Sequence, residues 1–175
     1  MIRVLLVFLT SSSLYAKGIS AEQLSTLQSV RDTAKKIPDY KGITYENTLS
    51  PICLTESSAG VNLLGDIKKG KSITNASLGP MQIKVQTAKH IAKLTPSLKY
   101  LLKYTDERIA TILLTDIKTS VKIAAHYLVR LKKSRKKYYY MVSGYNGGWS
   151  NRPYYSRVMK NYRTVAMLVK KGRLN

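Results

Sequence analysis

Apolar residues recur at helical spacing in one segment after another of this chain, and no segment shows sustained alternation of apolar and polar residues. The first clear case covers residues 20–37, where the apolar positions are Leu24, Leu27, Val30, Ala34 and Ile37. Ser20 is a good N-cap, and Pro38 ends the pattern. This periodicity, repeated along the chain, predicts a fold that is all-α or nearly so.

The remaining helices follow from the same spacing and from capping residues. They are predicted from Pro51 to about Gly60, from Pro80 to Lys93, from Thr105, from Asp116 or Thr119 to about Lys133, from Tyr138 to about Gly144, and from Tyr154 to Lys171. In the last helix, the side chains expected to face inward are Tyr155, Val158, Tyr162, Val165 and Val169. Residues 61–78 are expected to form a loop, and a loop of this length inside a compact domain usually has a function.

The charge of the chain is strongly one-sided, with 30 Lys and Arg against 9 Asp and Glu and a formal net charge of +21. Such a charge indicates an anionic partner or surface, for which nucleic acid, anionic lipid and cell-wall polymer all qualify. Residues 1–16 combine one arginine, a short apolar run and a small residue at position 16, as in a secretory signal peptide. We therefore expect one exported domain over residues 17–175, in the periplasm or cell envelope, and export argues against nucleic acid as the partner.

Glu56 stands out because it follows the apolar residues of a short predicted helix in a chain with few acids. Apolar surroundings and the negative end of a helix dipole would both raise the pKa of its carboxyl group. A carboxylic acid that is still protonated near neutral pH can act as a general acid. On the local pattern alone, an exposed glutamate at a helix end is the simpler interpretation, so other motifs must decide.

The single cysteine and the two histidines give no indication of a site. Cys53 lies in the apolar run before Glu56, which is typical of a small core residue. His90 and His126 have no spacing that suggests pairing with this thiol or shared ligation of a metal. No metal and no other cofactor is therefore expected.

Four blocks of sequence, in a fixed order, carry a resemblance to a known family. They are Glu56-Ser57-Ser58, Gly79-Pro80-Met81-Gln82-Ile83 with Thr87-Ala88, Ala124-Ala125-His126-Tyr127-Leu128, and Gly144-Tyr145-Asn146-Gly147-Gly148, and residues 154–158 follow as a closing motif. Together they resemble the soluble-type (SLT) lytic transglycosylases, a lysozyme-like family that cleaves peptidoglycan. The resemblance covers roughly residues 49–162. It departs from the family at Pro80 and Ala59, where larger aliphatic residues are common, and in a longer segment between Glu56 and Gly79.

The resemblance implies a lysozyme-like fold with a catalytic cleft and a reaction that needs one carboxyl group. Glu56 would protonate the oxygen of the MurNAc–GlcNAc β-1,4 bond and then accept a proton from the C6 hydroxyl of the sugar, giving 1,6-anhydroMurNAc ends. By the same resemblance, Tyr145 would orient Glu56, Gln82 would hydrogen-bond the sugar or Glu56, and Ser57 would contact Glu56 or the glycan. Met81 would pack on a sugar face or belong to the core. Asn146 is expected mainly to hold its turn.

Three other functions remain open at this stage. A muramidase resembling goose-type lysozyme would hydrolyse the same bond and need a second carboxylate, for which Asp66 is the nearest acid in sequence. A non-catalytic peptidoglycan-binding or envelope-assembly protein would not need Glu56. A cationic membrane-permeabilising protein would depend on charge alone.

The expected partner is the peptidoglycan glycan strand, and Lys68, Lys69 and Lys71 could attract its acidic stem peptides. A secretion or conjugation machine that spans the envelope is a further candidate partner, consistent with the small size of the chain.

Overall fold

The computed structural model describes residues 18–67 and 72–175. Its elements are α1 (Ala21–Ala34), α2 (Glu46–Ser57), β1 (Leu64–Gly65), η1 (Ile73–Asn75), β2 (Ser77–Leu78), α3 (Val85–Leu94), η2 (Pro96–Lys103), α4 (Asp106–Thr115), α5 (Ile117–Arg135), α6 (Tyr138–Tyr145) and α7 (Arg152–Lys170), where η marks a 3₁₀ helix. The expected all-α, lysozyme-like fold class is confirmed. The predicted signal peptide and the lysines at positions 68, 69 and 71 lie outside the described residues.

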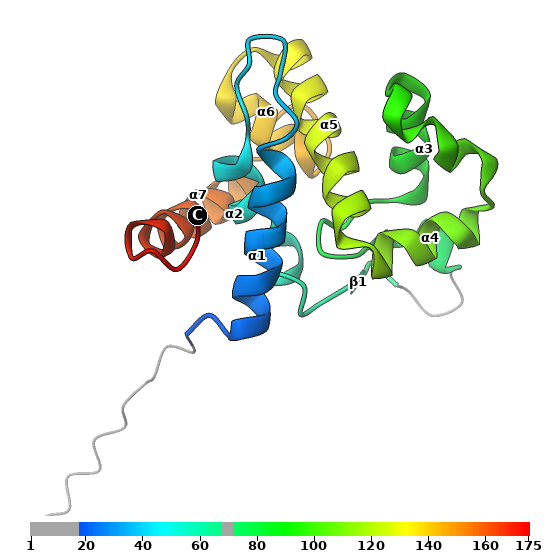
Figure 1. The fold of residues 1–175 in the computed structure, drawn as a ribbon. Helices are drawn as coiled ribbons and strands as arrows, with labels where there is room; N and C mark the ends of the chain where they lie inside the picture. Colours follow the sequence, from blue (N-terminus) through cyan, green and yellow to red (C-terminus); the bar gives the residue numbers. More distant parts are fainter. Residues whose placement is uncertain (1–17, 68–71) are drawn as a thin grey trace, which may run out of the picture.

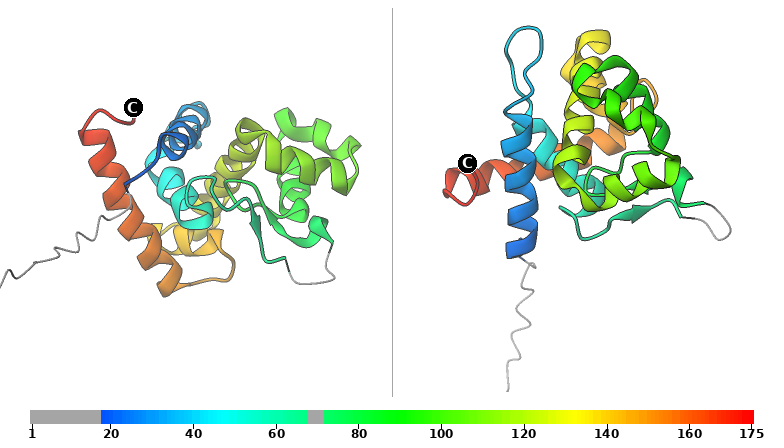
Figure 2. Two further views of the ribbon diagram at one scale, coloured as in Figure 1. Left: turned by 90° about the horizontal axis from the view of Figure 1, so that it is seen from below. Right: turned by 45° about the vertical axis from the view of Figure 1, so that its right-hand side comes forward.

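The helices form two groups on either side of α5 (Figure 1). On one side α2 packs between α1 and α7, and on the other side α3, η2 and α4 pack against one another. Two further views show the same division (Figure 2). Within 18–67 and 72–175, no helix has both the length and the apolar composition that a membrane crossing requires.

Helix α2 lies at the centre of the first group, and its side chains are buried in several directions. Leu49, Ile52 and Cys53 are fully inaccessible to solvent, which confirms Cys53 as a core residue. Burial raises the pKa of its thiol to about 12, so the group stays protonated and unreactive at neutral pH.

The predicted start of α2 is wrong. The helix begins at Glu46, and Pro51 lies inside it rather than at its first position. An internal proline cannot donate the usual backbone hydrogen bond, at a cost of about 3 kcal/mol. Packing of α2 against both α1 and α7 outweighs this loss, because it buries the residues that precede Pro51 as well as those that follow it.

Capping residues set the starts of α1, α4 and α5 as predicted. Ser20 forms a capping box with Gln23 at the start of α1. Thr105 caps α4, and the Asp116 side chain accepts a hydrogen bond of 3.0 Å from the Thr119 backbone at the start of α5. Each cap satisfies backbone N–H groups that a helix leaves unpaired in its first turn.

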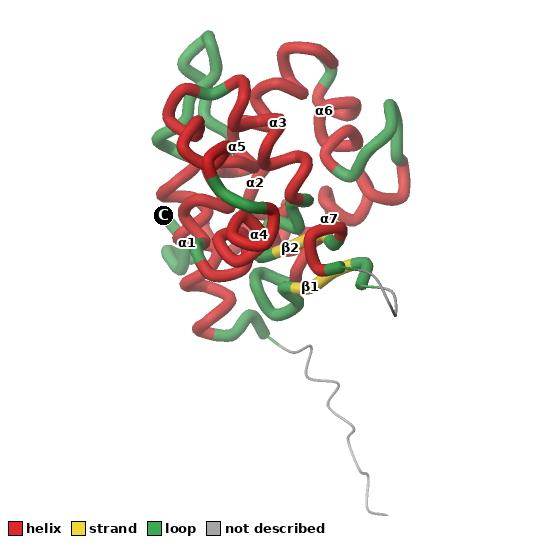
Figure 3. Tube along the Cα trace, turned by 90° about the vertical axis from the view of Figure 1, so that its right-hand side faces the viewer, coloured by secondary structure: helices red, strands yellow, loops and turns green. Residues whose placement is uncertain are grey.

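The segment between α2 and α3 is mostly loop, as expected, with a two-stranded antiparallel pair of β1 and β2 (Figure 3). The predicted helix over 80–93 is shorter than expected, because α3 begins only at Val85. Residues 79–82 form a tight turn instead, closed by hydrogen bonds in both directions between Leu78 and Ile83. Gly79 has φ +73°, and a Cβ atom there would lie 1.9 Å from the Leu113 carbonyl oxygen, so only glycine fits.

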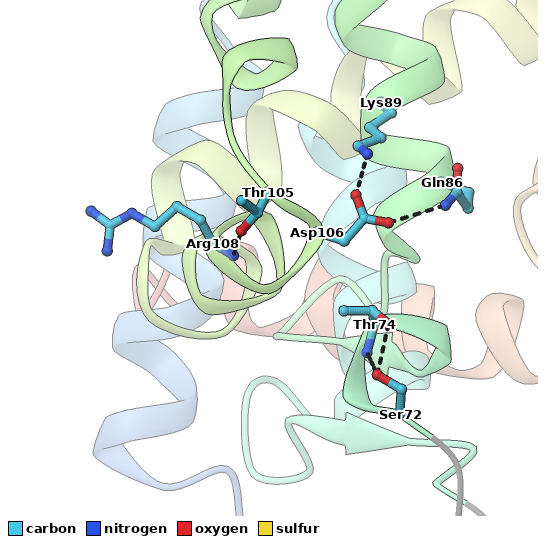
Figure 4. A network of polar contacts seen from close by, with 7 residues as sticks. All are labelled: Ser72, Thr74, Gln86, Lys89, Thr105, Asp106 and Arg108. Atoms are coloured by element: carbon cyan, nitrogen blue, oxygen red, sulfur yellow. Dashed lines mark hydrogen bonds and ion pairs between the residues drawn. The ribbon is translucent and has the colours of Figure 1, made fainter.

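A small polar cluster joins the start of α4 to α3 (Figure 4). Asp106 forms an ion pair with Lys89, and its second oxygen accepts a hydrogen bond of 3.4 Å from Gln86. Thr105 and Ser72 cap their own short elements close by. These contacts hold α4 against α3, close to residues 83–87 at the start of α3.

The inward face of α7 agrees with the predicted one at Val158 and Val165 and differs from it at other positions. Tyr154, Val158, Val165 and Leu168 are buried, whereas Tyr155 is only half-buried and Tyr162 is exposed. The helix begins at Arg152 with Asn151 as its cap, and Tyr154 in its first turn contacts Glu56 of α2.

Candidate active site

Glu56 lies in the last turn of α2 at the edge of a cavity of about 470 Å³. The cavity is formed where α2, the β1–β2 pair, α5 and the end of α6 meet residues 79–84. These residues comprise the tight turn and the two residues after it, and are called the 79–84 turn below. Its lining residues are Glu56, Gly65, Asp66, Ser77, Gln82, Ile83, Lys84, Thr87, Tyr127, Tyr145, Asn146 and Gly147. A largely polar cleft of this kind, with one partly buried acid, is a candidate site for a polar polymer.

Among the residues that the structure describes, one side chain hydrogen-bonds the carboxyl group of Glu56. The hydroxyl of Tyr154 donates a hydrogen bond of 2.6 Å to Glu56 Oε1. Burial raises the pKa of the Glu56 carboxyl above its ordinary value, and the nearby charge of Asp66 also raises it. The Tyr154 hydrogen bond and the charge of Arg157 act in the opposite direction without cancelling the effect of burial.

Tyr145 is close to Glu56 but does not hold it. Its hydroxyl donates a hydrogen bond of 3.0 Å to the Met81 carbonyl, and its ring lies 5.5 Å from that of Tyr127. Tyr127 in turn donates to the Gly144 carbonyl at 3.1 Å. The two tyrosines therefore form one wall of the cavity and tie the end of α6 to the 79–84 turn.

Gln82 takes part in the cavity wall with an unusual backbone, at φ +48°. Its amide nitrogen donates to the carbonyl of Gly79 at 2.9 Å and to that of Asn62 at 3.2 Å. A Cβ atom at Gly65 would lie 2.0 Å from Gln82 Oε1, so the absence of a side chain at Gly65 makes room for this amide. Within residues 18–67 and 72–175, the amide oxygen has no hydrogen-bond partner, and Gln82 lines the cleft.

The family comparison agrees with this arrangement. The family model described as "Transglycosylase SLT domain" matches residues 39–164, which include Glu56 and the whole cavity lining. This chain belongs to the transglycosylase SLT family. Neither the curated proteins nor the solved structures include a significant match to it.

Ser57 and Met81 of this SLT domain do not reach the cleft, which corrects the expected role of Ser57 and favours the core alternative for Met81. Ser57 is fully buried, and its hydroxyl donates to the Pro80 carbonyl at 2.7 Å and accepts from the Gly60 backbone at 2.8 Å. It therefore fastens the end of α2 to the 79–84 turn. The Met81 side chain is also fully buried, so it belongs to the core.

Asn146 lies where a turn residue was expected. Its side-chain oxygen accepts a hydrogen bond of 3.0 Å from Asn151, the cap of α7, and it also lines the cavity. The residue thus spans the α6–α7 connection at the edge of the SLT cleft.

Sequence reasoning missed Tyr154 as the partner of Glu56. Asn151 accepts a hydrogen bond of 3.0 Å from the Tyr154 backbone, but this cap indicates only where α7 begins and not which side chain faces Glu56. The prediction was right at Val158 and Val165, but it placed Tyr155 and Val169 inward where the structure buries Tyr154 and Leu168. Tyr145 was expected in the role that Tyr154 has in the structure.

Proposed function

We propose that this SLT-domain protein is a peptidoglycan lytic transglycosylase in which Glu56 alone supplies the acid and base. The observation that carries the proposal is the Glu56 carboxyl group itself, which is partly buried in a polar cleft and hydrogen-bonded to Tyr154. Burial raises the pKa of this carboxyl. A raised pKa keeps a larger share of the group protonated near neutral pH, as a general acid requires.

In the proposed reaction, Glu56 donates its proton to the oxygen of the MurNAc–GlcNAc bond while the bond from that oxygen to C1 of MurNAc breaks. The resulting Glu56 carboxylate then accepts the proton of the C6 hydroxyl of the same MurNAc. The C6 oxygen forms the new bond to C1, which closes a 1,6-anhydro ring. Glu56 ends protonated, as it began, and no water is consumed.

The neighbours of Glu56 support both steps. Tyr154 fixes the carboxyl orientation, and its hydrogen bond stabilises the carboxylate formed after the first proton transfer. Gln82 offers an amide to the hydroxyl or acetamido groups of the sugar. We assign substrate contact to Gln82 and positioning to Tyr154.

The muramidase alternative keeps one supporting observation. Asp66 lines the same cavity as Glu56, and its charge contributes to the raised pKa of the Glu56 carboxyl. Ser77 donates to Asp66 at 3.3 Å, which holds the carboxylate on the β1–β2 side of the cleft. If Asp66 activated water, Asp66→Asn would abolish cleavage, whereas in the transglycosylase mechanism it would leave most of the activity.

The assignment of the acid is tested by release of soluble fragments from purified sacculi. We expect Glu56→Gln to lose at least about a thousandfold in rate, since it removes the proton donor and acceptor together. The matched control is Glu107→Gln on the exposed surface of α4, which should retain full activity. Equal release by the Glu56→Gln and parent proteins would rule out Glu56 as the acid, whereas release by neither protein would favour a binding or assembly role.

An exported protein would meet this substrate in the periplasm or cell envelope, and we propose that location. Opening of the peptidoglycan layer for a secretion or conjugation machine is a compatible role. Fractionation of cells that produce a tagged full-length chain would test the location.

A further inference from the structure

Trp149 lies in the α6–α7 connection, close to the cleft but outside its lining. Asn146 and Gly147 of the same connection line the cavity, and Trp149 follows two residues later. The connection forms an open loop beyond the end of α6 (Figure 2, left). The indole side chain is 61% exposed, and it belongs to the only tryptophan of the sequence.

The exposed indole is held in place from two directions. Arg135, in the last turn of α5, donates a hydrogen bond of 2.8 Å to the Trp149 carbonyl, and its guanidinium lies 4.8 Å from the indole centroid. The Tyr140 ring of α6 lies 5.7 Å from the indole at a tilt of 37°. Both contacts reduce the entropy that the side chain would lose on binding a ligand.

Trp149 is also the exposed end of a row of aromatic rings. Tyr140 contacts Tyr139 at 5.1 Å, Tyr139 contacts Tyr155 at 5.0 Å, and Tyr155 contacts Tyr138 at 6.4 Å, as centroid distances. These tyrosines are half-buried, whereas the indole is mostly exposed. These ring contacts pack the α6–α7 connection against both helices. The position of the exposed indole is therefore fixed relative to α6 and α7.

We propose that Trp149 is a sugar-binding platform that extends the cleft along the glycan strand. The occupant is a pyranose ring of the strand beyond the sugars bound at Glu56, stacked by its C–H face on the free indole surface. The indole can accept this contact because a side chain that is 61% exposed cannot be covered on both faces by Arg135 and Tyr140. Aromatic rings suit such an occupant, since they combine a large apolar face with little flexibility.

Arg135 adds a feature that distinguishes a peptidoglycan strand from a neutral polysaccharide. Its guanidinium is partly exposed beside the indole, and no acid occurs in residues 117–175. A carboxylate of the lactyl group or stem peptide could therefore pair with it while the sugar ring stacks on Trp149. This inference rests on the proposed function, and it assigns the sugars that bind outside the reaction centre.

The single tryptophan makes the platform directly observable. In the Glu56→Gln protein, which cannot cleave its ligand, the intrinsic tryptophan emission reports on Trp149 alone. Glycan strands of graded length are the probe. We expect long strands to change the emission saturably and the disaccharide repeat to leave it unchanged, because the short ligand does not reach beyond the cleft.

Variants then measure the contribution of the platform by calorimetry, which needs no fluorophore. In the Glu56→Gln background, Trp149→Ala should weaken binding of long strands about tenfold, the effect of a stacking contact of roughly 1.4 kcal/mol. Trp149→Phe should recover part of the affinity. Tyr104→Ala removes an aromatic side chain of 40% exposure from the η2–α4 connection and should change nothing.

The possible results separate the platform from the proposed function. If the parent cleaves strands, but emission stays constant during binding or Trp149→Ala binds as tightly as its parent, the platform is overturned and the function stands. If the parent does not cleave and the Glu56→Gln protein does not bind, both proposals fail. An equal loss of affinity for short and long strands would also overturn the platform, because it would place Trp149 within the cleft or in a purely structural role.

Discussion

At the residue scale, the central feature is a carboxyl group whose environment disfavours its charge. Burial is the largest influence on the pKa of Glu56, and the single hydrogen bond from Tyr154 opposes it. The sequence predicted this acid and the direction of its pKa shift. It did not predict the partner, because Tyr154 and Tyr155 are neighbours in the first turn of α7, and which of the two side chains reaches α2 is decided by how α7 packs in the folded chain.

Tyr154→Phe is expected to change the pH dependence of cleavage. A general acid must be protonated, so activity falls as pH rises through the pKa of Glu56. Loss of the Tyr154 hydrogen bond raises this pKa further, and the alkaline limb of kcat/KM moves to higher pH. At lower pH, kcat should fall about ten- to hundredfold, because the carboxyl is no longer held in position.

Tyr145→Phe is the matched control for that measurement. It removes a hydroxyl that donates to the Met81 carbonyl rather than to Glu56. We expect a loss of about 1–3 kcal/mol in stability from the unpaired buried carbonyl, without a shift of the alkaline limb. A shifted limb in Tyr145→Phe and an unchanged limb in Tyr154→Phe would reverse the roles of the two residues.

Glu56→Gln should also make the protein more stable at neutral pH. Because the folded pKa of Glu56 is raised, the unfolded chain loses this proton first as pH rises, and the parent loses stability above the ordinary glutamate pKa. Glutamine carries no such penalty. Melting curves should therefore show a higher Tm for Glu56→Gln at pH 7 and a difference that vanishes in acid, whereas a lower Tm at pH 7 would contradict the buried environment.

At the element scale, the site depends on how the end of α2 is joined to the 79–84 turn. Ser57 bonds the Pro80 carbonyl, and Tyr145 bonds the Met81 carbonyl. Helical periodicity could not reveal this turn, because Met81 and Val85 are spaced to share one helix face with Ala88 and Ala92. What decides the local structure is Gly79, whose position against the Leu113 backbone exists only in the folded chain.

Two glycines near this turn should respond differently to substitution. In Gly79→Ala, the new Cβ would overlap the Leu113 backbone and strain a positive φ, so stability should fall by several kcal/mol, of the order of other severe core disruptions. In Gly65→Ala, the Cβ meets only the Gln82 amide, which can rotate. Thermal unfolding and sacculus digestion should show an unstable Gly79→Ala, and a stable Gly65→Ala with reduced activity.

At the scale of the whole molecule, charge and fold act separately. Within 18–67 and 72–175 a single ion pair forms, Lys89 with Asp106, although the chain holds 30 basic residues. Most of the positive charge is therefore free to act on a partner. Composition predicted an anionic partner, and helical periodicity with caps predicted the fold class and most helix positions. The cleft, which joins residues far apart in sequence, could be inferred only through the family motifs.

Salt should accordingly inhibit the reaction on intact sacculi. Raising the ionic strength from about 0.05 M to about 0.5 M shortens the screening length several-fold, which weakens attraction to stem-peptide carboxylates. We expect a decline of about tenfold or more in initial rate on sacculi and a smaller decline on uncharged soluble oligosaccharides. Equal salt sensitivity on both substrates would show that the net charge does not guide the polymer to the cleft.

The most direct test of the single-acid mechanism is the mass of the products formed from purified peptidoglycan. Cleavage through the C6 hydroxyl of MurNAc predicts fragments that end in 1,6-anhydroMurNAc, each lighter by one water than the corresponding hydrolysis product. These fragments should be absent when Glu56→Gln is used under the same conditions. Products with reducing MurNAc ends would contradict the mechanism, because they require an activated water and would make Asp66 the second carboxylate.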